Sequence, residues 1–367
     1  MNVFDVIVIG AGAWGTSTAA ALTERGNRVL LLDRYEVPHK LGSSHGHARV
    51  MSRVTDITRQ PLLARAWRRW AALSAQSSPS ITRPTQAVYV LDQHSSFLSM
   101  SISSRFGPKF ELIPAPEAAR RFPGFVVRPG ELVLHYPQAF VLDPELYIEA
   151  RLAAARRRGL TTQFAEPANQ WTTTDQGVTV VTDRDEYRAE RLVLAVGPWL
   201  HDLVDVALPI TVERQVAVWF KARPGFHPVI FSVPCRPPAT FLYGLPDRDG
   251  FCKVAFHHGG DSGQHPDTVD RIPGEADIAR VQAIVRERVP LLDDEPLRAE
   301  ICLYTNSQDL RFIVGVHPRH SNVFIAGADN GDGLTFAPSI GDELAEMVAG
   351  RGGELLTSSA PSRFARE

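Results

Sequence analysis

Short apolar runs and amphipathic stretches alternate at both ends of the chain. Phe4–Ile9 is an apolar run that ends in glycine, as buried parallel strands do, and Gly26 closes a helical pattern that begins at Ala13. At Asp143-Pro144, an aspartate cap followed by proline predicts another helix start. The predicted helices are Ala13–Arg25, Gln60–Ala75, Asp143–Gly159, Glu275–Val289 and about Ser339–Ala349, and the predicted strands at the two ends are Phe4–Ile9, Arg28–Asp33, Arg191–Val196, Arg298–Tyr304, Phe312–Val316 and Val323–Ala326.

The middle of the chain has a different pattern. From about residue 209 to 260, alternating positions with turn residues between them predict a series of strands. Since α/β units at both ends flank this β-rich middle, we expect an α/β fold in which a β-sheet-rich domain is inserted into a discontinuous α/β domain. The α/β domain is predicted to comprise residues 1–85, 140–208 and 298–367, and the inserted domain residues 86–139 and 209–297.

Composition and charge exclude several classes of protein. Of the 367 residues, 44% are hydrophobic and 22% charged, which is typical of a globular protein with one or two domains. A net charge of −2 gives no reason to expect a nucleic acid or an anionic membrane as partner. No apolar run approaches the roughly 20 residues that span a bilayer. Met1–Leu22 lacks a basic start and contains Asp5, so it predicts a strand and a helix rather than a signal peptide, and we expect a cytoplasmic protein.

Cysteine and lysine are both scarce. The three cysteines, Cys235, Cys252 and Cys302, have no metal-type spacing and exclude a disulfide framework. Almost all basic residues are arginine, so each retained lysine is a candidate for a role that arginine does not fill. Lys253 is the most unusual of them, because it lies in the apolar run Phe251–Phe256, where an unpaired charge is costly. A solvent-facing lysine on an edge strand is the alternative.

The opening run G-A-G-A-W-G at residues 10–15 matches the pattern G-x-G-x-x-G. It follows a predicted strand and opens a predicted helix, and Asp33 ends the next strand. In such a motif Gly10 permits the tight turn, Gly12 lets a pyrophosphate approach the backbone, and Gly15 lets the helix pack on the strand. The helix N-terminus offers N–H groups to phosphates, and Asp33 can accept hydrogen bonds from ribose hydroxyls. The run therefore predicts a dinucleotide site. Asp33 disfavours NADP, and the run itself leaves FAD and NAD open.

Further segments of the chain resemble those of one protein family, and this resemblance favours FAD over NAD as the dinucleotide. They occur in one order between residue 3 and about 350, and their pattern resembles that of the monomeric sarcosine oxidase and N-methyltryptophan oxidase family. This resemblance implies the fold of the D-amino-acid-oxidase type, in which a Rossmann-like FAD-binding domain carries a β-sheet-rich substrate domain. The segments are Gly42–Arg49 (G-S-x-H-G-x-x-R), Arg214–Val216, Lys253 with His257, Cys302–Thr305 (C-x-Y-T) with Phe312–Val314, and Ser321–Gly333.

The resemblance implies which residues hold the FAD. In the family the equivalent of Cys302 carries the flavin covalently, through a thioether to its 8α-methyl group, which withdraws electron density and favours oxidation of an amine. A buried strand cysteine without this role is the alternative. The expected cofactor-binding residues are Gly10, Gly12, Gly15, Asp33, Arg34, Ser43, Ser44, His45, Arg49, Cys302, Gly331, Gly333, Leu334 and Thr335.

The resemblance also implies an FAD-dependent amine oxidase. A hydride passes from the C–H next to a neutral amine to the flavin, and O2 reoxidises the flavin to give H2O2. By resemblance Lys253 activates O2, His45 and Arg49 lie over the flavin ring, and His257 and Tyr243 line the active site. The alternatives are an amine dehydrogenase or biosynthetic enzyme with another electron acceptor, a non-catalytic flavoprotein, and an NAD-dependent dehydrogenase, which explains neither Cys302 nor the C-terminal glycines.

The chain departs from the family where its members clamp a substrate carboxylate. Ser52 stands where the family has an arginine, Thr335 where it has a lysine, and Asp332 where it has a histidine. A carboxylate would thereby lose charge-assisted hydrogen bonds, each of roughly 1.5–3 kcal/mol. Two readings remain: Arg53 replaces the lost arginine, or the substrate is an amine without a free carboxylate, such as an esterified or carrier-bound amino acid. The expected substrate-pocket residues are Arg53, Tyr243, His257, Asp332 and Thr335, and the expected assembly is a monomer or weak oligomer.

Overall fold

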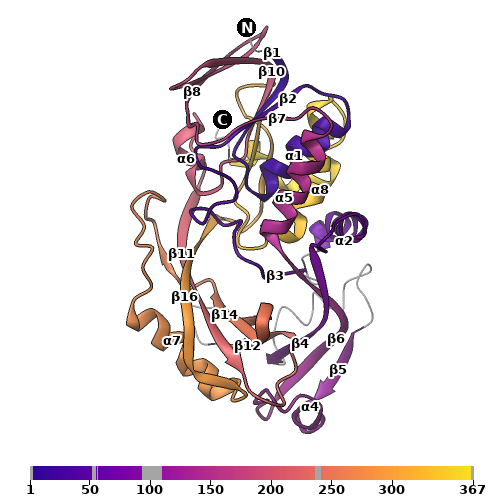
Figure 1. The fold of residues 1–367 in the computed structure, drawn as a ribbon, viewed down its shortest axis with the longest axis vertical. Helices are drawn as coiled ribbons and strands as arrows, with labels where there is room; N and C mark the ends of the chain where they lie inside the picture. Colours follow the sequence, from indigo (N-terminus) through magenta and orange to yellow (C-terminus); the bar gives the residue numbers. More distant parts are fainter. Residues whose placement is uncertain (1–2, 52–54, 56, 93–109, 236–240, 365–367) are drawn as a thin grey trace.

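The fold consists of two β-sheets and the helices around them, and each sheet forms one half of the molecule (Figure 1). The computed structural model describes residues 3–51, 55, 57–92, 110–235 and 241–364. The long strands β11 (Ile210–Ala222) and β16 (Leu292–Ser307) run from the upper half into the lower one in this view. These two strands therefore connect the two halves, and each contributes residues to both.

The first sheet contains the N-terminal strand. Its strand order is β17-β18-β10-β1-β2-β7, and β9 adds to β10 and β8 to β9. All pairs from β18 to β7 are parallel, so the carboxyl ends of these strands meet at one edge, where open α/β sheets bind ligands. The strands are β1 (Val3–Ile9), β2 (Val29–Leu32), β7 (Thr161–Gln163), β8 (Ala168–Thr174), β9 (Gly177–Thr182), β10 (Glu186–Leu194), β17 (Ile313–Val316) and β18 (Val323–Gly327).

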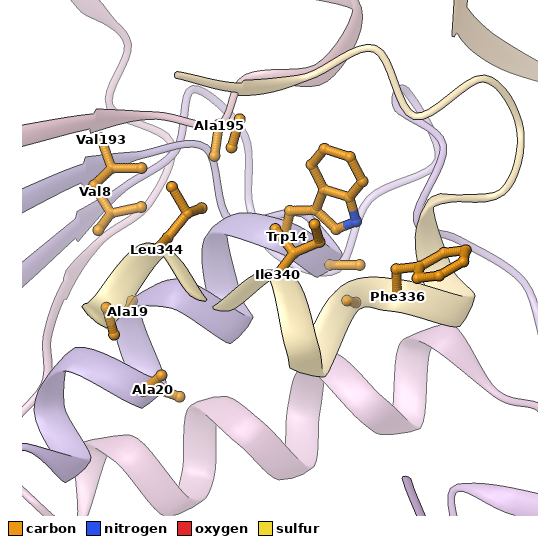
Figure 2. Close-up of a cluster of buried hydrophobic side chains, with 14 of the residues drawn as sticks. Val8, Trp14, Ala19, Ala20, Val193, Ala195, Phe336, Ile340 and Leu344 are labelled. Atoms are coloured by element: carbon orange, nitrogen blue, oxygen red, sulfur yellow. The ribbon is translucent and has the colours of Figure 1, made fainter. Parts of the chain in front are cut away.

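Three helices cover one side of this sheet: α1 (Ala13–Glu24), α5 (Pro144–Arg156) and α8 (Gly333–Val348) (Figure 1). Figure 2 shows α1 and α8 packed closely, with apolar side chains between them and the sheet. The contact needs a small residue, because a Cβ at Gly341 would lie 2.5 Å from the backbone of Ser17. Helix α1, which begins at the glycine run, therefore packs tightly against the C-terminal helix α8.

The second sheet forms the other half. Its strand order is β15-β11-β14-β13-β12-β4-β6-β3, with β16 pairing with β11 and β5 with β6. Its core is covered on one face by α7 (Glu275–Arg288), through Val281 and Val285. The remaining strands are β3 (Arg49–Val50), β4 (Thr82–Asp92), β5 (Glu111–Pro114), β6 (Glu131–Leu142), β12 (Ile230–Pro234), β13 (Phe241–Pro246), β14 (Phe251–His257) and β15 (Asp261–Ser262). The remaining helices are α2 (Gln60–Ala75), α4 (Ala115–Arg121) and α6 (Leu200–Leu203), with the short 3-10 turns η1 (Ile57–Arg59), η2 (Gly197–Trp199), η3 (Arg248–Gly250), η4 (Glu354–Ser359) and η5 (Pro361–Phe364).

The predicted elements at both ends of the chain are confirmed, with three differences in length. Strand β16, predicted as Arg298–Tyr304, runs from Leu292 to Ser307, because it pairs with β11 over nearly its whole length. Helix α8 begins at Gly333 rather than near Ser339, and Pro338 lies inside it. The proline removes a helical hydrogen bond, but the burial of α8 against α1 and the sheet outweighs that loss. Strand β10 begins at Glu186, earlier than predicted, because its polar first half pairs with β9 at the surface.

The predicted fold class, α/β with a second sheet-rich part, is confirmed. The domain boundaries themselves stay a prediction. In the part of the chain that the structure describes, no helix has the length and apolar character needed to cross a membrane.

Candidate functional site

The glycine run forms a tight turn between β1 and α1. Gly10 has a φ of +99°, and a Cβ there would lie 2.3 Å from the carbonyl oxygen of Ala195. At Gly15 a Cβ would lie 1.7 Å from the carbonyl oxygen of Gly10. Neither position can carry a side chain without moving the backbone. Gly12 lines the cavity described below, and a Cβ there would lie 3.3 Å from the hydroxyl oxygen of Ser44, so a side chain would be tight at this position as well.

Asp33 holds the turn from the end of the next strand. Its Oδ2 accepts the Ala11 N–H at 2.7 Å, and its Oδ1 accepts the Tyr35 N–H at 2.9 Å. Burial raises the pKa of this carboxyl, while the two backbone donors act in the opposite direction. Asp33 thus joins the glycine run to the segment that follows β2, and both line the same cavity.

A cavity of about 410 Å³ runs along the carboxyl edge of the first sheet to the second sheet. It brings together segments that are far apart in the sequence, from the N-terminal glycine run to the start of α8. Among the predicted cofactor residues, Gly15 packs beneath the turn, and neither it nor His45 lines the cavity. Those that line it are Gly10, Gly12, Asp33, Arg34, Ser43, Ser44, Arg49, Cys302, Gly331, Gly333, Leu334 and Thr335.

Arg49 and Cys302 meet at the second-sheet end of this cavity. The Nη2 of Arg49 lies 3.9 Å from the sulfur of Cys302 and donates to the carbonyl of Ser43 at 3.0 Å. The Ser43 hydroxyl in turn donates to the carbonyl of Leu303, next to the cysteine. The G-S-S-H loop and the C-L-Y-T strand, which the sequence analysis treated as separate segments, therefore form one wall.

His45 lies directly behind this wall. The residue is 4% exposed, and neither ring nitrogen has a hydrogen-bond partner among the described residues. Burial, together with the charges of Arg49 and Lys253, lowers the pKa of His45 to about 2, so its imidazole is neutral. Buried polar atoms without partners are rare and costly, so the buried imidazole of His45 lowers the stability of the flavin-free protein.

The register of the second sheet puts Lys253 on the same face as Cys302. Lys253 pairs with Trp219 across β14 and β11, and Cys302 pairs with Gln215 across β11 and β16. Trp219 and Gln215 are four residues apart on β11, so their side chains and those of their partners lie on one face of the sheet.

Lys253 is 5% exposed. Its Nζ lies 3.5 Å from the carbonyl oxygen of Ala48 and 5.7 Å from the centre of the Trp219 ring. Burial, and next the charge of Arg49, lower the pKa of Lys253 to about 7. The ammonium can therefore lose its proton near neutral pH.

His257, Tyr243 and Tyr304 form a cluster on the same face. The Tyr304 hydroxyl lies 3.5 Å from His257 Nδ1, the Tyr243 hydroxyl hydrogen-bonds to Tyr304, and Phe241 stacks on the imidazole at 4.8 Å. Burial lowers the pKa of His257 to about 4, so the ring is neutral, and burial raises the pKa of both tyrosines. Tyr304, which lines the cavity, was missed by the sequence analysis. The sequence could have indicated Tyr304, because it lies two residues after Cys302 and therefore on the same face of the strand.

The predicted substrate-pocket residues are brought together only in part. Asp332 lines the cavity, with its Oδ2 3.7 Å from the Nη1 of Arg59. The Thr335 hydroxyl donates to the carbonyl of Val50 at 3.0 Å. Asp329 also lines the cavity, and burial together with Asp332 raises its pKa to about 6. Ser52 and Arg53 lie outside the described residues.

The residues present fit FAD. Gly10 and Gly12 line the cavity without side chains, Asp33 directly follows β2 as a ribose acceptor must, and the cavity reaches from Gly10 to Cys302.

Known proteins resemble the chain over nearly its whole length. The chain is 31% identical to the monomeric sarcosine oxidase of Streptomyces avermitilis over 361 residues, which covers 94% of this chain and 93% of that protein. It is 29% identical to the N-methyl-L-tryptophan oxidase of Salmonella agona, with 99% and 100% covered. Among solved structures, NikD, an unusual amino acid oxidase essential for nikkomycin biosynthesis, shares the fold with a TM-score of 0.83 at 24% identity, over 95% of this chain and 94% of that one.

A match to a protein family covers nearly all the residues that form the two sheets. The model of the family described as FAD dependent oxidoreductase matches residues 5–347, which include the glycine run, β14, β16 and the start of α8. The chain therefore belongs to the family of FAD-dependent oxidoreductases.

Proposed function

We propose that the protein oxidises a small amine at the C–H bond next to nitrogen, with FAD as cofactor and O2 as electron acceptor. The observation that carries this proposal is the arrangement of Lys253, His257 and Cys302 on one face of the second sheet. Of the three, Cys302 itself lines the cavity that begins at the glycine run, and His257 contacts Tyr304, which also lines it. The relatives named sarcosine oxidase and N-methyl-L-tryptophan oxidase support it. Those named monomeric support a monomer.

Three groups of residues would hold the cofactor. The backbone at Gly10–Gly15 and the N-terminus of α1 offer N–H groups to its phosphates, and Asp33 accepts from its ribose. Cys302 is proposed to bind the flavin covalently through its sulfur. Bound there, FAD supplies a two-electron acceptor that takes a hydride from the amine and passes the electrons on to O2.

His257 is proposed to orient the amine. A neutral imidazole can accept a hydrogen bond from an amine N–H without repelling it, and Tyr304 and Phe241 restrict the position of the ring. In the overall reaction the amine loses two hydrogens and becomes an imine, which water can hydrolyse, and O2 gains them and becomes H2O2.

Lys253 is proposed to assist the reaction with O2. A compact buried ammonium stabilises negative charge as O2 takes up electrons, and this effect is strong where water is excluded. With the pKa of Lys253 at about 7, the charged form is fully present only below neutral pH.

The substrate is proposed to lack a free carboxylate. Asp332, which is 3.7 Å from Arg59, and Asp329, which has no ion pair among the described residues, bring carboxylates to the cavity wall, and the Thr335 hydroxyl is engaged with the backbone of Val50. A carboxylate would be repelled by the first two and would gain no ion pair from the third. An amine of an esterified or carrier-bound amino acid would meet neither obstacle.

The proposal is tested by anaerobic mixing of the holoprotein with pairs of secondary amines that differ only in a carboxylate or its methyl ester. We expect the ester to bleach the flavin absorbance faster, and readmitted O2 to yield one H2O2 per amine consumed. Flavin that no amine bleaches would contradict amine oxidation. Bleaching without H2O2 would leave the amine as donor but reject O2 as acceptor, and faster bleaching by the free acid would reject the substrate class.

A further inference from the structure

A segment of the second-sheet half crosses to the first-sheet half beside the nucleotide end of the cavity. It consists of residues Gly263–Gly274, between β15 and α7, and is called the strap here. Its base is fixed on the second sheet: Arg214 of β11 donates to the carbonyls of Asp270 at 2.7 Å and Ile272 at 3.1 Å. Val269 packs on the same sheet among buried apolar side chains. The strap thus starts from a rigid support.

The tip of the strap binds residues of the other half. Asp267 pairs with Arg34 at 3.3 Å and accepts the indole N–H of Trp199 at 2.7 Å. His265 pairs with Asp202 at 2.9 Å. The guanidinium of Arg34 also lies over the Trp199 ring, 5.5 Å from its centre.

These contacts lie at the nucleotide end of the cavity. Arg34 follows Asp33, the proposed ribose acceptor, and Arg34, Trp199, Asp202 and Asp267 all line the cavity wall. This end of the cavity is therefore lined both by the Asp33 segment and, through Asp267, by the strap.

Arg271 gives the strap a donor for a ligand. Its Nη2 donates to the carbonyl of Pro266 at 3.0 Å, while its Nη1 is buried and has no hydrogen-bond partner among the described residues. Arg271 does not itself line the cavity, but its charge acts on Tyr35 and His39, which do. A buried guanidinium nitrogen without a partner costs free energy, which an oxygen acceptor of a ligand would offset.

We infer that the strap is a second binding element for the nucleotide part of FAD, which is held between the two halves of the molecule. Arg271 supplies a hydrogen bond to an oxygen of the nucleotide, and the Asp267 contacts keep the strap closed over it. The cofactor can enter or leave only when Asp267 separates from Arg34 and Trp199. This role concerns FAD binding and is independent of the proposed substrate and electron acceptor.

The test measures release of FAD after dilution of the holoprotein, followed by the rise of flavin fluorescence. All variants carry Cys302→Ser, so that a covalent bond does not hide dissociation. Asp267→Asn and Arg271→Met are each expected to accelerate release about tenfold, since each loses a charge-assisted hydrogen bond. The matched control is Asp293→Asn, which breaks the exposed pair Arg223–Asp293; its side chains are 40% and 39% exposed, against 38% and 40% for Arg34 and Asp267.

Two further measurements separate this role from a structural one. In flavin-free protein, Asp267→Asn is expected to leave the melting temperature unchanged, whereas the increase that FAD produces is expected to shrink. In protein without the Cys302→Ser change, limited trypsin digestion followed by mass spectrometry is expected to cut after Arg271 faster in Asp267→Asn than in Asp293→Asn. Release at the rate of the control, or equal losses of melting temperature with and without FAD, would overturn the inference.

Discussion

The guanidinium of Arg49 lies 3.9 Å from the sulfur of Cys302, although 253 positions separate the two residues in the chain. After burial, the charge of Arg49 is also the largest influence that lowers the pKa of Lys253 and of His45. One arginine therefore acts on three groups at the end of the cavity. A change of its charge would alter all of them together, so single substitutions of the three groups are the cleaner tests.

The first prediction concerns the covalent bond to flavin. Holoprotein denatured in acid is expected to keep its flavin in the protein pellet, and the Cys302→Ser variant is expected to release all of it, because serine oxygen does not form the proposed thioether. Flavin absorbance in pellet and supernatant measures this. Cys235→Ser serves as control and should retain flavin as the unaltered protein does. Complete release from the unaltered protein would reject the bond.

The second prediction assigns Lys253 to the reaction with oxygen. Lys253→Met is expected to slow reoxidation of the reduced flavin by about 100-fold, since removal of one preorganised charge typically costs that much. Reduction by substrate should change only a few-fold. Stopped-flow absorbance separates the two half-reactions, and Lys221→Met, an exposed lysine on β11, is the control.

The same assignment predicts a dependence on pH. Because the pKa of Lys253 is about 7, its charge is present below that pH and is lost above it. Reoxidation by O2 should therefore slow as the pH rises through about 7, and this slope should vanish in Lys253→Met. A slope that persists in the variant would assign the titration to another group.

The third prediction links His45 to stability. The pKa of His45 is about 2 in the folded protein, whereas the ordinary pKa of a histidine is about 6.5, so between these values only the unfolded chain takes up the proton. The free energy of unfolding of flavin-free protein should accordingly fall as the pH drops below 6.5, with His45 contributing up to about 2 kcal/mol at pH 5. Urea unfolding at pH 7 and pH 5 measures this. His45→Gln should flatten the dependence, and His227→Gln, at an exposed position, should not.

The sequence predicted local structure well where one interaction dominates. The strand, turn and helix at residues 3–24 follow from an apolar run and from Gly10 and Gly15, where a side chain would clash with the backbone. The start of α8 was wrong, because burial against α1 outweighs the cost of Pro338 and burial cannot be deduced from a local pattern.

The site was predicted in parts rather than as a whole. Each segment was identified from its own motif, but the contact between Ser43 and Leu303 and the strand register that aligns Lys253 with Cys302 are tertiary facts. The strap was missed altogether. His265 and Asp267 are exposed polar residues in a loop, and only the folded chain brings them against Trp199 and Asp202.

The last prediction concerns Asp332 and the choice of substrate. Asp332 lines the cavity beside Asp329, and its charge, after burial, raises the pKa of the Asp329 carboxyl. Asp332→Asn removes one negative charge with little change in shape. We expect it to tighten the binding of a carboxylate-bearing amine analogue about tenfold, a factor that corresponds to roughly 1.4 kcal/mol, and to leave the binding of the methyl ester unchanged within about twofold. Titration of the flavin absorbance with both ligands measures the two dissociation constants. Asp175→Asn, an exposed acid in the turn between β8 and β9, controls for net charge. Equal tightening by both substitutions would mean that the effect comes from the overall charge of the protein, and then Asp332 does not set the preference against carboxylates.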